Sequence, residues 1–260
     1  MPFQYLPVDS AIPHPGLRMV VVPNVPSPWG EAAKGIFHIK KIEWHAVRLA
    51  YDSEALKNWA GQTSGQLSGP VAIYNEERPR SGWADILLLA ERLAPYPSLL
   101  PADPTKRALV FGLAHEICGE EGLGWTRRLQ LVHAGLQDKP GFPAPVAKYL
   151  AKKYGYRTEA AGGYGTRVTR LLGMLATQLK YQREQNIPYY VGNSPTAADV
   201  YSATFMALFA PLPHAQCAMK PDTRAAFEAL DEETKAALHP SLLDHRDMMY
   251  AKHLELPLSL

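Results

Sequence analysis

The chain contains 260 residues, of which 47% are hydrophobic and 20% charged, and these ordinary globular values exclude disordered and low-complexity classes. Lys and Arg together number 27 against 25 Asp and Glu. The resulting formal charge of +2 indicates no broad basic face for nucleic acid or for an anionic membrane. The two cysteines, Cys118 and Cys217, lack the spacing of zinc or iron–sulfur ligands, and free thiols fit a reducing compartment.

Neither end of the chain shows a pattern typical of membrane insertion. The first 16 residues contain four prolines and no Lys or Arg, so they do not have the basic start of a signal peptide. The longest uncharged stretch of the second half, residues 200–219, is interrupted by Pro211 and Pro213 and is unsuited to span a bilayer. We therefore expect a cytoplasmic protein.

The first third of the chain alternates between strand and helix patterns. Residues 1–16 are expected to form an irregular arm. The β-branched run at 17–22 predicts a buried strand, residues 28–41 have the 3.6-residue periodicity of a helix, and 43–50 return to a strand pattern. A strand, a helix and a strand in succession form a βαβ unit, so the two strands are expected to be parallel.

The remainder of this first region is predicted to contain a short helix, a third strand and a longer helix. Ser53 is the expected cap of a helix over 53–62, a strand begins at Gly69–Pro70, and residues 83–93 form a leucine-rich helix. Four prolines between Ala94 and Pro104 then predict a stiff linker.

Downstream of the linker the patterns are helical throughout. The sequence thus predicts an arm at 1–16, an α/β domain at 17–94, a linker at 95–104 and an all-helical domain at 105–260. The expected helices cover 104–121, 122–137, 143–155, 160–186, 196–210, 223–238 and 241–253.

Three short motifs, taken with this domain order, resemble the cytosolic glutathione transferases of the serine type. The motifs are Pro-Ser-Pro-Trp at 26–29, Gly69–Pro70 before the third strand, and Gly-Asn-Ser-Pro-Thr-Ala-Ala-Asp at 192–199. The last contains a capping box, in which Thr196 and Asp199 bond reciprocally to the backbone at the start of a helix. The resemblance covers residues 17–212 and implies a thioredoxin-like first domain and a helical second domain.

The resemblance also implies roles for individual residues. Ser27 would stabilise the thiolate of glutathione by a hydrogen bond at the positive end of a helix, with Asn24 as the neighbouring alternative. A plain helix cap is the other interpretation of Ser27. Pro70 would be a cis-proline, and Gly69 would dock the cysteinyl backbone of glutathione.

The glutamyl end of glutathione presents a departure from the transferase pattern. Ser81 stands where the transferases have the serine of a Glu-Ser pair, at the start of a helix suited to bind a carboxylate. Arg80 stands at the position of the expected Glu, and two alternatives follow: it pairs with that carboxylate, or it disturbs the charge pattern of the pocket. Glu77 or Asp85 would then have to supply the negative charge that the α-ammonium group needs.

The pocket for the electrophile is expected to be lined by residues of the second domain and by the residue next to Ser27. These candidates are Trp29, Phe111, His115 and Trp125, and Tyr164, Arg167 and Arg170 are further ones. The histidines show no HExxH motif or i, i+4 pair, so no metal site is expected.

The sequence therefore predicts an enzyme that adds the thiolate of its co-substrate glutathione to a small apolar electrophile, with a role in detoxification. A glutathione-dependent relative that cleaves an ether or carbon–halogen bond is one alternative. A non-catalytic binding protein of the same fold is another. The resemblance implies a homodimer, and no nucleic-acid or membrane partner is expected.

Overall fold

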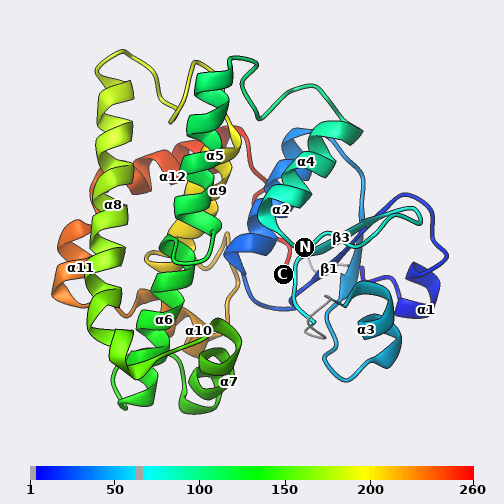
Figure 1. The fold of residues 1–260 in the computed structure, drawn as a ribbon, viewed down its shortest axis with the longest axis horizontal. Helices are drawn as coiled ribbons and strands as arrows, with labels where there is room; N and C mark the ends of the chain where they lie inside the picture. The colour runs from blue at the N-terminus through cyan, green and yellow to red at the C-terminus, as the bar shows by residue number, and fades with distance from the viewer. Residues whose placement is uncertain (1–3, 62–66) are drawn as a thin grey trace.

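The structure is a computed structural model that describes residues 4–61 and 67–260, with a small sheet on one side and a group of helices on the other (Figure 1). The elements before the linker are α1 (Val8–Ala11), β1 (Leu17–Val21), α2 (Pro28–Ile39), β2 (His45–Arg48), α3 (Glu54–Ala60), β3 (Val71–Tyr74) and α4 (Trp83–Leu93). Those after it are α5 (Pro104–Cys118), α6 (Leu123–Leu136), α7 (Ala144–Tyr154), η1 (Thr158–Ala160), α8 (Ala161–Arg183), α9 (Ala197–Phe205), η2 (Met206–Leu208), α10 (Pro221–Glu228), α11 (Glu232–Ala237) and α12 (Pro240–Lys252).

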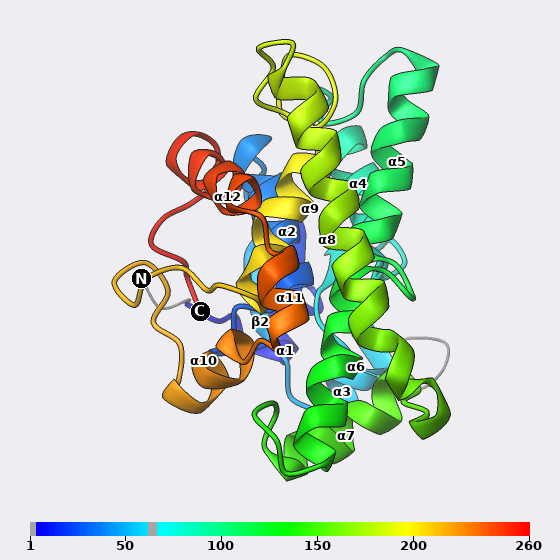
Figure 2. The same ribbon diagram turned by 90° about the vertical axis from the view of Figure 1, so that its left-hand side faces the viewer.

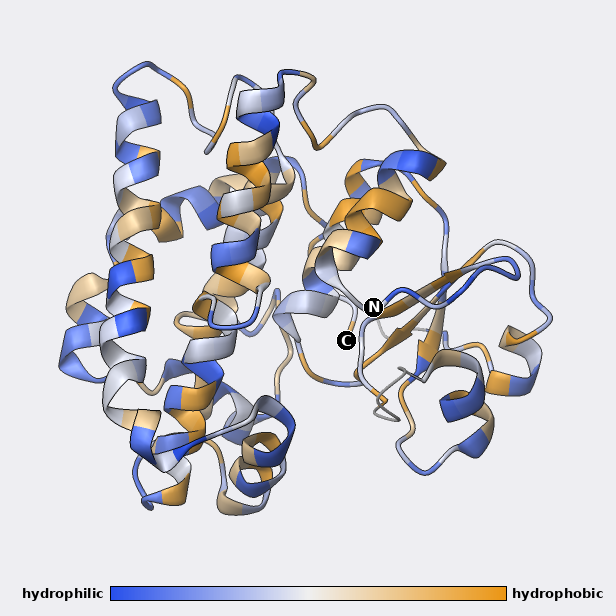
Figure 3. Cartoon of the chain, viewed as in Figure 1, coloured by the Kyte–Doolittle hydropathy of each residue, from blue (hydrophilic) through white to orange (hydrophobic). Residues whose placement is uncertain are grey.

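The sheet has the order β2-β1-β3, with β1 in its centre. Strands β1 and β2 are parallel, as the βαβ pattern predicted, and Val20 lies opposite Val47. Strand β3 is antiparallel to β1, and there Val20 lies opposite Val71. All five residues of β1 are buried, which explains why its sequence is apolar at every position except Arg18 and does not alternate. Figure 3 shows the same hydrophobic character along the strands.

The residues before β1 are more ordered than the sequence suggested. Within the expected irregular arm, Val8–Ala11 form the short helix α1, and Tyr5 forms a parallel bridge with Ala46 on the outer edge of β2. Ala11 is fully buried, and its carbonyl accepts a hydrogen bond of 3.1 Å from the Arg18 guanidinium. The arm is therefore packed onto the sheet, because it supplies an apolar side chain and a carbonyl acceptor for a buried arginine.

The two halves of the molecule meet along α2 and α9, which pack against each other. Helix α9 also packs against α5 and α12, and α6 packs against α7 and α8 (Figure 2). One continuous hydrophobic core extends from the sheet and α2 into the helical half. The linker is fastened to the first half, because Lys40 donates hydrogen bonds of 2.8 Å to the carbonyl of Pro97 and to the Glu91 carboxylate.

The capping box of α9 holds several segments together. The buried Asp199 carboxylate accepts hydrogen bonds from the backbone N–H groups of Thr196 and Tyr190, each at 2.8 Å. It also lies 2.9 Å from Nε2 of His245 on α12. A buried carboxylate needs several such partners, so this side chain fixes α9 and hence the position of α2.

One predicted helix is divided in two. The sequence favoured a single helix over 223–238, but α10 ends at Glu228 and α11 begins at Glu232. Asp231 is the reason, since its side chain accepts a hydrogen bond of 2.8 Å from the N–H of Thr234 and so caps a new helix. Among residues 4–61 and 67–260, no helix combines the length and apolar character that a bilayer span requires.

Candidate functional site

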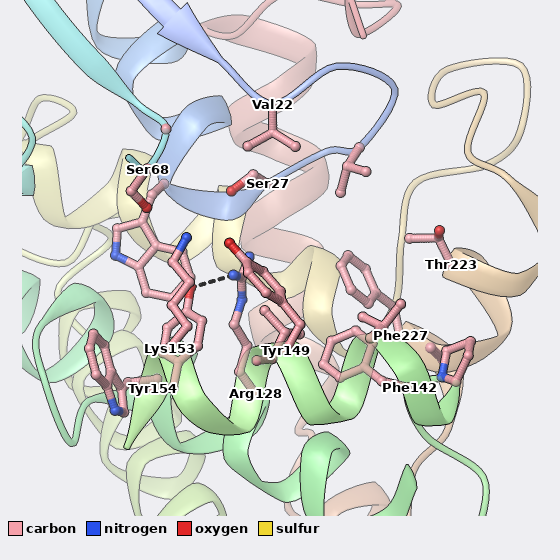
Figure 4. Close-up of a pocket in the computed structure, with 18 of the residues that line it drawn as sticks. Val22, Ser27, Ser68, Arg128, Phe142, Tyr149, Lys153, Tyr154, Thr223 and Phe227 are labelled. Carbon is pink, nitrogen blue, oxygen red and sulfur yellow. Dashed lines mark hydrogen bonds between the residues drawn. The ribbon is translucent and has the colours of Figure 1, made fainter. Parts of the chain in front are cut away.

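A cavity of about 560 Å³ lies between the loops of the first half and the helices α6, α7 and α10 of the second (Figure 4). Its first wall consists of residues that precede the linker, and its second wall of residues of the helical half, several of them aromatic or cationic. The first wall is lined by Val22, Val25, Ser27, Trp29, Tyr51, Ser68, Gly69, Pro70 and Ser81. The second is lined by Trp125, Arg128, Phe142, Pro143, Val146, Tyr149, Leu150, Lys153, Tyr154, Lys220, Asp222, Thr223, Ala226 and Phe227.

Ser27 is the residue at which α2 begins, and it faces the cavity. Its carbonyl accepts the first helical hydrogen bond, 2.8 Å from the N–H of Glu31, but its hydroxyl makes no capping bond to the helix. The side chain is largely buried and yet borders the cavity. The hydroxyl is therefore available to a ligand at the positive end of α2. Asn24, the alternative, is exposed, has a positive φ of 58° and does not line the cavity.

Gly69, Pro70 and Ser81 lie with Ser27 on the same wall. The Gly69–Pro70 peptide bond is cis. The helix that follows Ser81 spans Trp83–Leu93 as predicted, and its N-cap is Gly82 and not Ser81. Ser81 thus precedes the helix, and its hydroxyl makes no capping bond there.

Arg80 does not take part in this wall. Its guanidinium lies 2.6 Å from the Glu77 carboxylate, which also accepts hydrogen bonds of 2.6 and 2.7 Å from Arg92. The hydrogen bonds from Arg92, and to a smaller extent the contact with Arg80, hold the pKa of Glu77 below its usual range. The backbone of Arg80 bonds to Ala72 beside β3, which turns its side chain away from the cavity.

Trp29 joins the two walls. Its indole N–H donates a hydrogen bond of 2.9 Å to the carbonyl of Cys118 at the end of α5. The edge of its ring packs at 4.8 Å from Phe205 of α9. A Cβ on Gly124 would lie 2.3 Å from Phe205 and 3.1 Å from Trp29, so only glycine allows α6 to approach so closely. The indole is consequently fixed by both halves of the molecule.

The second wall presents two cations to the cavity. The Arg128 guanidinium lies over the rings of Trp29 at 4.6 Å and Tyr154 at 5.3 Å, and it donates a hydrogen bond to the Tyr154 hydroxyl. Lys153 is partly buried beside it. Burial, and secondly the positive charge of Arg128, lower the pKa of Lys153 to about 8. In Figure 4 the polar ends of Arg128, Tyr149 and Lys153 point toward the loop that carries Ser27.

Aromatic side chains cover other parts of this wall. Phe142 and Phe227 pack edge to face at 6.3 Å and form an apolar region beside the cations (Figure 4). Tyr51 from the first half and Tyr149 from α7 also meet edge to face, at 5.9 Å, across the cavity. Burial raises the pKa of the Tyr51 hydroxyl above its ordinary value.

Two of the four predicted electrophile-pocket residues lie elsewhere. Trp29 and Trp125 line the cavity, but Phe111 and His115 do not. Their rings lie 6.3 and 6.5 Å from that of Trp83 on α4, because this face of α5 is turned toward the first half. The additional candidates on α8 also lie outside it, since Arg167 pairs with Glu116 at 2.5 Å. Tyr164 bonds to the backbone of Arg157, and Arg170 is likewise absent from the lining.

The most informative residues of the second wall were not predicted. Arg128 lies three residues after Trp125 on the same face of α6, and Lys153 lies four residues after Tyr149 on α7. The sequence of α7 contains a pattern that could have identified Lys153. One helix face, with the i, i+3, i+4, i+7 spacing, carries Val146, Tyr149, Leu150 and Lys153. A lysine at the last of these positions indicates a polar cavity and not a core.

The described parts of the chain contain no cluster of three His, Cys, Asp or Glu residues arranged to hold a metal ion. No family model matches the sequence, and no curated protein matches it either. Many solved structures resemble it in fold.

Three glutathione S-transferase structures illustrate this likeness. A family member from Pseudomonas fluorescens with two glutathione molecules bound is 14% identical, with 94% of each chain covered and a TM-score of 0.61. An enzyme from Methylobacillus flagellatus with bound glutathione is 14% identical, with 90% of this chain and 94% of that one covered and a TM-score of 0.60. A third, from Methylobacterium radiotolerans in complex with glutathione sulfonate, is 17% identical, covers 91% of each chain and has a TM-score of 0.58.

The fold is that of the glutathione S-transferases. It combines the predicted thioredoxin-like α/β domain with an all-helical domain, and the cavity lies between them. At these identities the likeness concerns the fold, and the chemistry of the site has to be argued from its own residues.

Proposed function

We propose that the protein is a glutathione transferase, in which the thiolate of glutathione attacks a small electrophile held against the second wall of the cavity. The observation that carries this proposal is the Ser27 hydroxyl, which faces the cavity at the start of α2 without capping the helix. A hydroxyl donor and the positive end of a helix both stabilise a thiolate relative to the thiol.

The neighbouring residues suit the peptide part of glutathione. Gly69 lies beside Ser27 on the same wall and would pair its backbone with the cysteinyl residue. Ser81, at the entrance to α4, would hold the glutamyl carboxylate by its hydroxyl and by backbone N–H groups. A cavity of about 560 Å³ is large enough for a ligand of this size.

Neither of the carboxylates near Ser81 is free to pair with the α-ammonium group of glutathione. Glu77 is held by Arg80 and Arg92, and Asp85 lies 3.6 Å from Arg78 and does not line the cavity. Under this proposal the counter-charge comes from the second subunit of a homodimer. The non-catalytic alternative rests on the same observation, because without a partner for this group glutathione would bind poorly.

Titration calorimetry with glutathione and with the dipeptide Cys-Gly, which lacks the glutamyl residue, tests the proposal. We expect glutathione to bind more tightly by about 1–3 kcal/mol for each polar contact that the dipeptide loses. The ultraviolet absorbance of the thiolate, followed against pH, should show that the thiol pKa of glutathione falls on binding.

Equal and weak binding of both ligands, in the millimolar range, would contradict the proposal and favour the non-catalytic alternative. Tight binding without a fall in the thiol pKa would separate recognition of glutathione from its activation. The same calorimetry on protein resolved by size-exclusion chromatography would show whether only the dimer binds.

A further inference from the structure

The second wall of the cavity carries positive charge that no side chain of the described chain neutralises. Arg128 and Lys153 lie side by side, and Lys220 also borders the cavity. Asp222, at the first turn of α10, is the single carboxylate among the described lining residues, and it is exposed. Buried and half-buried cations are normally paired, so this excess of charge calls for an anion from outside the chain.

Arg128 is oriented to bind such an anion. Its guanidinium carbon lies over the Trp29 ring at 4.6 Å and 5.3 Å from the centre of the Tyr154 ring, and one of its N–H groups donates to the Tyr154 hydroxyl. Its buried Nε has no hydrogen-bond partner. These contacts hold the guanidinium in place and leave part of its hydrogen-bonding capacity unused, which suits a carboxylate or a sulfonate.

Lys153 adds a second donor next to the first. Within residues 4–61 and 67–260 its ammonium group forms no hydrogen bond or ion pair, and it lies 5.9 Å from the centre of the Tyr154 ring. Its depressed pKa of about 8 is what an unpaired, partly buried lysine beside an arginine should show. A bound anion would offset both causes, the loss of solvent and the repulsion from Arg128.

The rest of the wall defines the other half of the ligand. Phe142 and Phe227, with Val146 and Leu150 nearby, form an apolar surface next to the two cations. Figure 4 shows the aromatic pair on one side of the cavity and the ends of Arg128 and Lys153 opposite Ser27.

We propose that the electrophile of this protein is an amphipathic anion, with a carboxylate or similar group bound by Arg128 and Lys153 and an apolar part packed on Phe142 and Phe227. This inference rests on the proposed function only in that it assigns the ligand the role of the electrophile. The anion site itself does not depend on glutathione, because its residues come from α6 and α7 and not from the wall of Ser27, Gly69 and Ser81.

The test compares two fluorescent probes of nearly equal shape, 1-anilinonaphthalene-8-sulfonate, which is anionic, and N-phenyl-1-naphthylamine, which is neutral. Both are titrated into the wild type and into Lys153→Met, Arg128→Gln and Lys152→Met. Lys152 is exposed on the same helix and outside the cavity, which makes it a matched control. Thermal unfolding of each variant establishes that it is folded.

We expect Lys153→Met and Arg128→Gln each to lower the affinity for the sulfonate probe about tenfold, because a charged hydrogen bond is lost in a half-buried site. The affinity for the neutral probe should fall less than about twofold. Lys152→Met should change neither. If Arg128→Gln does not fold, Lys153→Met decides the matter alone. An equal loss for both probes, or no loss for either, would overturn the proposal.

A pH series supplies a second readout. Between pH 7 and 9 the sulfonate stays charged while Lys153 loses its proton, so the wild type should bind the sulfonate more weakly as the pH rises and Lys153→Met should not. The other titratable and charged groups that line the cavity with this lysine are Tyr51, Arg128, Tyr149, Tyr154, Lys220 and Asp222. A pH dependence that persists in Lys153→Met would assign the effect to one of them and contradict the role given to Lys153.

Saturating glutathione separates this proposal from the proposed function. If glutathione binds and leaves the sulfonate in place, the cations belong to the electrophile. If glutathione displaces it, the cations hold a carboxylate of glutathione and the inference is overturned. If glutathione does not bind at all, the proposed transferase activity is wrong, while selective binding of the sulfonate still establishes the anion site.

Discussion

The two walls of the cavity differ in what positions them. The first wall is built from the ends of β1 and β3 and the start of α2, so its functional groups are a hydroxyl and backbone atoms held by a rigid sheet. The second is built from long side chains on α6 and α7, and their charge and shape define it. Under the two proposals, the first wall would bind the peptide part of glutathione, whereas the second would discriminate among electrophiles by charge.

The largest expected effect belongs to the first wall. Ser27→Ala should lower turnover with glutathione by about 10²–10⁴-fold, because the hydroxyl donor to the developing thiolate is lost. Its free energy of unfolding should hardly change, since the hydroxyl makes no capping bond. Steady-state kinetics and urea unfolding of the same preparation measure the two quantities.

Ser53 provides the matched control for this serine. It is also an N-cap, but its hydroxyl accepts a hydrogen bond of 3.2 Å from the N–H of Leu56 and lies outside the cavity. Ser53→Ala should therefore lower stability by about 1 kcal/mol and leave turnover unchanged. Turnover that survives in Ser27→Ala would show that the first wall does not activate the thiol.

The next effect concerns the residue that joins the walls. Trp29→Phe keeps an aromatic ring but removes the N–H that bonds to the Cys118 carbonyl, and it weakens the stacking of Arg128. The unsatisfied carbonyl should lower the free energy of unfolding by about 1–3 kcal/mol. Thermal or urea unfolding measures this loss. Arg128 would lose orientation as well, so binding of an anionic ligand should weaken more than binding of a neutral one. Unchanged stability would mean that the walls are held together without this bond.

The difference between the walls also explains how far the sequence could be interpreted. Ser27, Gly69 and Pro70 stand in short contiguous motifs, and the structure brings them together as predicted. Arg128 and Lys153 lie on two separate helices, and their proximity follows from how α7 packs on α6, which no local pattern records. Phe111 and His115 were misplaced for the same reason, because helical periodicity gives a face but not the neighbour that the face meets.

The overall fold was more accessible than the site. The parallel pair, the third strand and the change to helices after the prolines all follow from local patterns, and they are confirmed. Residues 1–16 and the division of α10 from α11 were missed. In both places a few polar contacts, those of Arg18 and Asp231, decide the structure of an otherwise ambiguous segment.

A smaller effect should appear in the pH dependence of stability. The folded pKa of Lys153, about 8, lies below the usual value of 10.5, so between these values the unfolded chain binds more protons than the native protein. Stability must then rise with pH in that window relative to a variant without the group. The unfolding free energy of the wild type should therefore increase, relative to Lys153→Met, between pH 7.5 and 9.5 in urea titrations. A constant difference would show that the lysine already has an anionic partner.

The smallest effect is expected at Arg80, which the sequence placed on the glutamyl carboxylate of glutathione. In the structure its guanidinium binds Glu77 and does not border the cavity. Arg80→Ala should therefore change the affinity for glutathione less than about twofold, and stability by less than about 1 kcal/mol, as is usual for a solvent-accessible ion pair. Arg92 would still hold Glu77, so no carboxylate is released to bind the α-ammonium group.

Ser81 belongs to the same segment but lines the cavity, so Ser81→Ala should lower the affinity for glutathione more strongly. Calorimetry measures the affinity of both variants for glutathione. A larger loss of affinity in Arg80→Ala than in Ser81→Ala would show that Arg80, and not Ser81, binds the glutamyl carboxylate.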